Sequence, residues 1–229
     1  MTTLTQIVNE IYVPADQPKV IGNYLLDTVI GEGRFACVRA GIHQLAQGQV
    51  AVKTLSKFCA SRGDTQRCLF FQESKSLRRL QHWNIVRLYE TMETKNTYYL
   101  VLEVIPGMSL STLLNKRGTL PENEAQLLIG QLASGVLYMT KSGIVHRSVY
   151  FGLSASCVAG QHLRDQCGTP MYAAPEIFGK QPYTGAVDVW SMGVVLCEMV
   201  TGIFHMFTDV FRGVVLCGMV TGVLFYVRW

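Results

Sequence analysis

The sequence predicts an α+β protein with a β-rich first part and an α-helical second part. Apolar and polar residues alternate on both sides of the glycines at 31 and 33, and short β-prone runs continue to residue 104. Pro106-Gly107 breaks this pattern, and beyond it the apolar residues recur at helical spacing. The change of period therefore places a small β lobe before an α lobe.

The composition describes an unusually apolar chain. Its 229 residues suffice for two small lobes, and charged residues make up only 16%. Net charge is +4 with Lys and Arg scattered among acids, which predicts no nucleic-acid partner. Seven cysteines without C-x-x-C spacing, and no secretion signal at the N-terminus, indicate an intracellular, cytoplasmic protein without a metal site.

In the first lobe, a lead-in at residues 1–21 precedes predicted strands at 24–30, 36–43 and 50–52. Gly31 and Gly33 allow a tight turn whose N–H groups can meet phosphate, although a plain hairpin turn is the alternative. A glycine turn between two strands argues against a dinucleotide fold, where it opens a helix. Lys53 ends the third strand with a charge suited to phosphate or to solvent.

A helix at residues 65–80 follows, and it places Glu73 on the apolar face of Phe70 and Leu77. An inward carboxylate is costly unless it is paired, so Lys53 is its expected partner, with a Glu that reaches water as the alternative. Further strands are predicted at 84–89 and 98–104 around a polar turn at 94–97. This gives five strands and one helix in residues 22–105.

In residues 106–202, Thr119 and Glu122 have capping-box spacing before a helix that runs to Gly143, and another apolar helix starts near Asp188. Residues 193–202 recur at 213–222 with nine of ten positions identical. The apolar run at 213–227 is shorter than the roughly 20 residues of a membrane helix. We therefore expect the tail, 203–229, to form a second helix that seeks a core, with an exposed or membrane-attached segment as the alternatives.

The order of motifs resembles that of the protein kinase family: Gly31, Gly33, Ala36 and Val38; Val50-Ala51-Val52-Lys53; Glu73; His146-Arg147; Phe151-Gly152; and Ala174-Pro175-Glu176. Residues 82–90, 99–103 and 167–176 are further similar to AMP-activated-kinase-related serine/threonine kinases of the Nim-like branch. The resemblance runs from about residue 21 to 202. It implies a bilobal kinase-like fold with an incomplete α-helical second lobe.

The resemblance implies an ATP site in the first lobe. Lys53 would contact the α and β phosphates while pairing with Glu73, and Leu102 would be the gatekeeper. Val38 and Ala51 would sandwich the adenine, and the backbone of Glu103 and Ile105 would hold its edge. The segment over the phosphates would be Ile30, Gly31, Glu32, Gly33, Arg34, Phe35, Ala36, Cys37 and Val38.

The catalytic half departs from the family. Ser148 stands where the base Asp is expected and Tyr150 where the metal-binding Asp is expected, with roughly sixteen residues missing between the motifs. Both Mg²⁺ sites depend on the lost residues, which argues against Mg²⁺ binding.

Four more residues are interpreted against the family pattern. Asp165 occupies the position of the activating phospho-threonine, as a weak mimic of that phosphate or as a solvated loop residue. His146 is expected to be a core or surface histidine and Cys167 a buried inert thiol. Asp188 would brace the catalytic loop in the family; without that loop, capping its helix is the expected role.

The sequence therefore favours a serine/threonine-kinase-like protein that binds ATP and has impaired or lost phosphotransfer. Its partners would be a nucleotide and a protein substrate or scaffold. One alternative is an active serine/threonine kinase or a truncated form of one, and another is a non-functional or membrane-attached truncated product.

Overall fold

The computed structural model describes residues 6–7, 19–32, 36–57, 63–147, 155–157, 161–168, 170–179 and 181–202. These residues divide into two compact units. The first comprises the described residues up to Ser74 together with Arg87–Pro106. The second comprises Lys75–Val86 and the described residues from Gly107 to Gly202.

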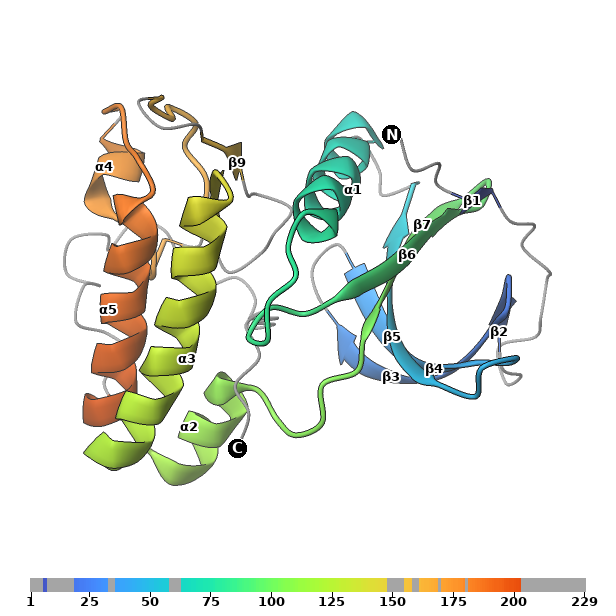
Figure 1. Ribbon diagram of the computed structural model, residues 1–229, viewed down its shortest axis with the longest axis horizontal. Coiled ribbons are helices and arrows are strands. Elements are labelled where there is room, and N and C mark those ends of the chain that lie inside the picture. The colour runs from blue at the N-terminus through green and yellow to red at the C-terminus, as the bar shows by residue number, and fades with distance from the viewer. Residues whose placement is uncertain are drawn as a thin grey trace. The chain divides into compact units, whose positions relative to one another are not determined.

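The first unit is built on a curved sheet of seven strands in the order β1-β6-β7-β5-β4-β3-β2 (Figure 1). All neighbours pair antiparallel except β1 and β6, which are parallel. The strands are β1 (Gln6–Ile7), β2 (Lys19–Ile21), β3 (Tyr24–Glu32), β4 (Ala36–His43), β5 (Gln49–Ser56), β6 (Leu88–Glu93) and β7 (Thr97–Glu103). Apolar residues on alternating positions give the sheet a buried cluster that includes Leu26, Val52 and Tyr99.

Helix α1 (Gly63–Arg78) buries the face that the sequence predicts, since Phe70, Glu73 and Leu77 are each at most 2% exposed. The ring of Phe70 stacks on Tyr98 of β7 at a centroid distance of 4.5 Å. A stacked aromatic pair of this kind contributes beyond its buried area and fixes the helix against the strand.

The second unit contains α2 (Leu110–Arg117), α3 (Glu122–Lys141), α4 (Pro175–Phe178) and α5 (Ala186–Thr201), with a short β8 (Ile144–Val145) and β9 (Ala155–Ser156) pair. Helices α3 and α5 lie side by side (Figure 1). Leu114, Leu128 and Met199 from α2, α3 and α5 share one buried cluster. The predicted α+β class is therefore confirmed.

Three local expectations were wrong. The strand expected at 84–89 begins only at Leu88, because Asn84 instead donates its side-chain amide to Gln131 of α3 (3.1 Å). Residues 19–21, assigned to the lead-in, form β2. The N-cap of α3 is Pro121 without a side-chain cap, so Thr119 and Glu122 form no capping box.

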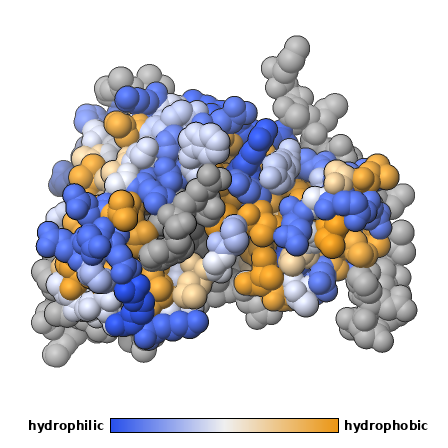
Figure 2. All heavy atoms as spheres, turned by 60° about the horizontal axis from the view of Figure 1, so that its bottom comes forward, coloured by the Kyte–Doolittle hydropathy of each residue, from blue (hydrophilic) through white to orange (hydrophobic). Residues whose placement is uncertain are grey.

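Apolar residues also reach the surface. Figure 2 shows hydrophobic residues in several separate places among hydrophilic ones on the face drawn there.

No helix within the described ranges is long and apolar enough to cross a membrane. The repeated segment at 213–222 lies outside those ranges.

Candidate functional site

One face of the sheet gathers the residues that the sequence assigns to nucleotide binding. The strand register places Val38 of β4 opposite Lys53 of β5, and Lys53 opposite Leu100 of β7. Side chains two positions apart on a strand share a face. Val38, Ala51, Lys53 and Leu102 therefore lie on the same face, with apolar side chains beside one cation.

Lys53 forms an ion pair with Glu73 of α1. Its Nζ lies 2.7 Å from Oε1 and 2.8 Å from Oε2 of that carboxylate. The Glu73 side chain is 2% exposed and that of Lys53 13%. A buried carboxylate is tolerated when it is paired and hydrogen-bonded, so the pair fixes the position of the ammonium group while one side of it stays accessible.

At the end of β7, the backbone N–H of Glu103 already donates a hydrogen bond within the protein. The Glu103 N–H donates to the Arg87 carbonyl (2.9 Å), so a ligand at this residue could meet only the carbonyl acceptor. Ile105 follows in a segment outside helices and strands and is half-buried.

The glycine segment connects two strands, as its flanks predict. Ile30, Gly31 and Glu32 end β3, and Ala36, Cys37 and Val38 begin β4, with Gly31 opposite Val38. A Cβ on Gly31 would meet the Val38 Cβ at 3.8 Å, which is an ordinary contact, so packing within the sheet does not require glycine there. Gly33, Arg34 and Phe35 lie outside the described residues.

In the second unit, the expectation that Asp188 caps helix α5 was wrong. The carboxylate accepts the backbone N–H of His146 and of Arg147, each at 2.8 Å, and it is buried. The N-cap of α5 is Gly185, so Asp188 does not cap its helix. The two carboxylate oxygens of Asp188 accept hydrogen bonds from residues 42 and 41 positions away in the chain, and local sequence could not reveal this contact. Burial raises the pKa of Asp188 to about 6.

His146 and Arg147 differ in environment. Burial lowers the pKa of His146 to about 3, so its imidazole is a neutral core group. The Arg147 Nη1 lies 3.2 Å from the Asp165 carboxylate and donates to the Tyr183 hydroxyl at 3.2 Å. Sequence reasoning missed this tyrosine, since nothing in its local pattern marks it.

The side chain of Asp165 is 80% exposed, whereas that of Arg147 is only 4% exposed, so water reaches this ion pair from the side of the carboxylate. Cys167, expected to be a buried inert thiol, is half-buried, and burial raises the pKa of its thiol. Ser148, Tyr150, Phe151 and Gly152 lie outside the described residues. Within the residues that are described, no three His, Cys, Asp or Glu side chains group as a metal site.

Comparison with known proteins gives the following similarities. Residues 24–150 and 149–210 match the family described as Protein kinase domain. Over 214 residues, the chain is 35% identical to the hormonally up-regulated neu tumor-associated kinase of Homo sapiens. The aligned region covers 84% of this chain and 30% of that protein. The Mus musculus protein of that name gives the same values.

A probable myosin light chain kinase from Dictyostelium discoideum is 34% identical over 211 residues, covering 83% of this chain and 53% of that protein. The chain thus spans between about a third and about half of the length of these relatives.

Proposed function

Since the chain belongs to the protein kinase family, we propose that it binds ATP through its first unit and that its phosphoryl transfer is impaired or lost. The observation that carries this proposal is the pair between Lys53 and Glu73, with Nζ–Oε distances of 2.7 and 2.8 Å. The pair holds a cation at a fixed place on the sheet face, where phosphate oxygens could meet it.

The remaining contacts to the nucleotide would come from neighbouring strands. Val38 and Ala51 offer apolar side chains for the adenine ring, with Leu102 behind them. The carbonyl of Glu103 would accept from the adenine amino group, because its N–H already serves Arg87. The glycine segment and the backbone of Ile105 would complete the site.

The proposed loss of phosphoryl transfer rests on the sequence between His146 and Phe151. Transfer draws most of its rate from positioning and from metal ions that neutralise the phosphates. Ser148 and Tyr150 supply neither the carboxylate base nor the metal ligand that these steps use. The family match is also divided at residues 149 and 150, next to those two positions.

The second candidate is an active serine/threonine kinase, and one contact favours it. Asp188 binds the backbone of His146 and Arg147, so the residues just before the departure from the family pattern are held in place. For either candidate we propose a protein substrate or scaffold partner and an intracellular location, which the free thiols of Cys37, Cys68 and Cys167 fit.

A thermal-shift titration with ATP tests the proposal. A ligand that binds only the folded state stabilises it by RT ln(1 + [L]/Kd), about 2.7 kcal/mol at a hundredfold excess over Kd. The informative variant is Lys53→Met with Glu73→Gln, because removing the lysine alone would leave a buried carboxylate unpaired. We expect ATP to raise the melting midpoint of the wild type, with or without Mg²⁺, and not that of this double variant.

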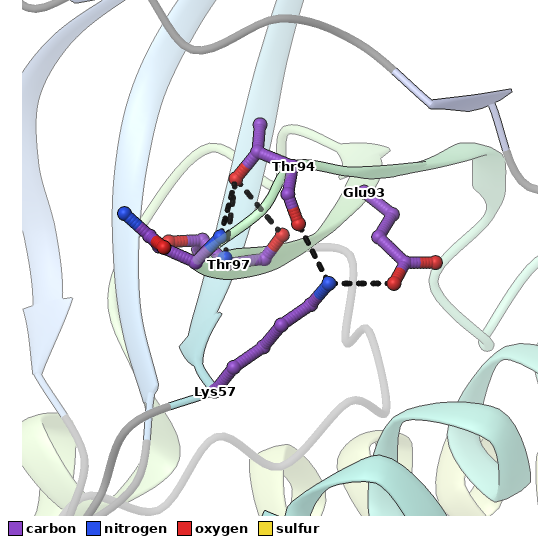
Figure 3. Close-up of polar contacts among 5 residues, drawn as sticks. Lys57, Glu93, Thr94 and Thr97 are labelled. Atoms are coloured by element: carbon purple, nitrogen blue, oxygen red, sulfur yellow. Dashed lines mark hydrogen bonds and ion pairs between the residues drawn. The ribbon is translucent and has the colours of Figure 1, made fainter.

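The matched control is Lys57→Met with Glu93→Gln. Lys57 also belongs to the first unit, and its Nζ lies 2.6 Å from Glu93 Oε1 and 2.6 Å from the Thr94 carbonyl (Figure 3). This control removes the same chemical groups four residues further along the chain, and its ATP shift should equal that of the wild type. An equal shift in all three proteins would place ATP elsewhere, and a shift that requires Mg²⁺ would favour the active kinase.

A further inference from the structure

Helix α3 exposes one side along its whole length, while its other side is packed. Leu128 and Met139 are at most 4% exposed, and Leu128 shares a buried cluster with residues of α2 and α5. On the exposed side, Leu127 is 68% and Leu137 is 55% exposed. Exposed residues recur there every three or four positions, which places them along one line of the helix. We call this line the α3 strip: Asn123, Leu127, Gly130, Ser134, Leu137 and Lys141.

The centre of the α3 strip consists of small residues. A Cβ built on Gly130 would have no heavy atom within 4 Å, so the space beside the backbone is open. The Ser134 Oγ lies 3.1 Å from His82 Nε2, so this hydroxyl has a hydrogen-bond partner in its own chain and could be covered without losing it. Leu127 and Leu137 flank this centre. Small residues between larger apolar ones let the axis of a second helix come near, so the strip is suited to helix packing.

The α3 strip is symmetric about its midpoint. Its residues are spaced by four, three, four, three and four positions, which is the same order in both directions. A second copy of the helix laid antiparallel on the first would therefore place Leu127 opposite Leu137 of the second copy, and Gly130 opposite Ser134 of the second copy. A contact in which one residue meets another and the reverse also holds is the isologous interface of a two-fold dimer.

The charges at the two ends of α3 favour the same arrangement. Glu122 is the first residue of the helix and Lys141 the last, and both are exposed. In an antiparallel pair, each Glu122 lies next to Lys141 of the second copy, so two contacts join opposite charges. A parallel pair would instead bring like charges together at both ends. Charge complementarity thus selects the antiparallel pairing.

We propose that the α3 strip joins two copies of this chain as an antiparallel, two-fold symmetric dimer. All residues of the strip belong to the second unit, whereas the proposed ATP contacts in the described residues belong to the first. The dimer therefore does not depend on the proposed function, and ATP is not needed to form it.

A loop beside the strip adds apolar surface to it. His82 contacts Ser134 of α3, and the Asn84 side chain donates to Gln131 of α3 at 3.1 Å, so both neighbours of Trp83 are held on the helix. Trp83 itself is 77% exposed. One helix and one loop form a contact at the small end of specific interfaces. We therefore expect a weak dimer, with a dissociation constant on the order of 10–100 µM.

Two other occupants fit the strip less well. Helices that lie on a membrane surface are rich in Lys and Arg, whereas α3 carries Lys141 as its one basic residue and two acids, Glu122 and Glu124, in its first turn. A partner of a different sequence would not require a symmetric strip with complementary ends. A second copy of the chain requires both features.

Sedimentation velocity of the full chain over a dilution series tests the proposal. We expect the wild type to change from monomer to dimer as its concentration rises. Leu127→Asp should weaken this association by about tenfold or more, because the two-fold symmetry would bury one unpaired charge at each of two contacts. The matched control is Leu45→Asp, a leucine 79% exposed in the first unit, and it should leave the dissociation constant unchanged.

Two charge reversals test the pairing itself. In Glu122→Lys, and separately in Lys141→Glu, both end contacts would join like charges, so each variant alone should associate several-fold more weakly than the wild type at low salt. An equimolar mixture of the two should recover the wild-type affinity, because each mixed dimer again pairs opposite charges at both ends. Both reversals also oppose the helix dipole, and mixing cannot repair that effect. Recovery therefore reports the contact between the chains.

Three results would overturn the proposal. The first is a monomer at concentrations up to about 500 µM, well above the expected dissociation constant. The second is a dimer that Leu127→Asp leaves unchanged, which would place the contact elsewhere. The third is a mixture of the charge-reversed variants that associates no better than either variant alone. This third comparison also covers the case in which Leu127→Asp fails to fold.

Discussion

At the scale of single residues, His146 predicts an acid-sensitive contribution to stability. Burial lowers its pKa from 6.5 to about 3, so the folded state binds this proton less readily than the unfolded chain. Its contribution is complete above pH 6.5 and is lost as the pH falls toward 3. From pH 7 to pH 5 we expect wild type to lose about 2 kcal/mol more unfolding free energy than His146→Phe, measured by urea denaturation.

Asp188 acts with the opposite sign in the same pH range. Its pKa is raised to about 6 by burial, so its ionisation reduces stability as the pH rises from about 4 to 6. Its carboxylate accepts backbone N–H groups, which His146→Phe retains, so the difference between the two proteins isolates the imidazole. Equal pH slopes in wild type and variant would contradict the assignment of a neutral buried histidine.

At the scale of elements, the C-terminus of α5 depends on Gly202. This residue has φ of +66°, and its N–H donates to the Glu198 carbonyl. A Cβ there would meet the Gly118 carbonyl oxygen and the Thr119 Cγ2 at 3.0 Å each. We expect Gly202→Ala to lower the unfolding free energy by about 1–2 kcal/mol, measured by chemical denaturation.

Gly130 of α3 is the matched control for Gly202. It lies inside a helix, and a Cβ there would have no heavy atom within 4 Å. Gly130→Ala should therefore raise the unfolding free energy by roughly 0.5–1 kcal/mol, through helix propensity. The two substitutions should thus change the unfolding free energy in opposite directions, which separates the need for a left-handed backbone conformation at Gly202 from a general effect of alanine. Two changes of the same sign would refute this account.

At the scale of the whole molecule, the proposed ATP contacts in the described residues all belong to the first unit. Hydrogen exchange followed by mass spectrometry should therefore show ATP slowing amide exchange in β3, β4, β5 and β7, because binding stabilises those strands against opening. Exchange in α3 and α5 should not change. Slowing in α5 that depends on Mg²⁺ would instead show that the nucleotide acts on both units, as the active-kinase candidate requires.

The sequence alone determined the class of fold and the family. The strands predicted on both sides of the glycine segment and at Lys53 are β3, β4 and β5, and the helix predicted to carry Glu73 is α1. The sequence could predict these elements because local periodicity and turn chemistry decide them. The same local rules failed at residues 84–87, where a side-chain bond to α3 replaces the strand, and at Thr119, where Pro121 begins the helix instead.

Only the tertiary structure decided which distant groups meet. The bonds from Asp188 to His146 and Arg147, and from Arg147 to Tyr183, join residues 36 to 42 positions apart. Such contacts depend on how helices and loops pack, and no local period records them. The same is true of α5: its sequence is as apolar as that of a buried helix, and only the packing showed that Val189, Leu196 and Val200 are exposed.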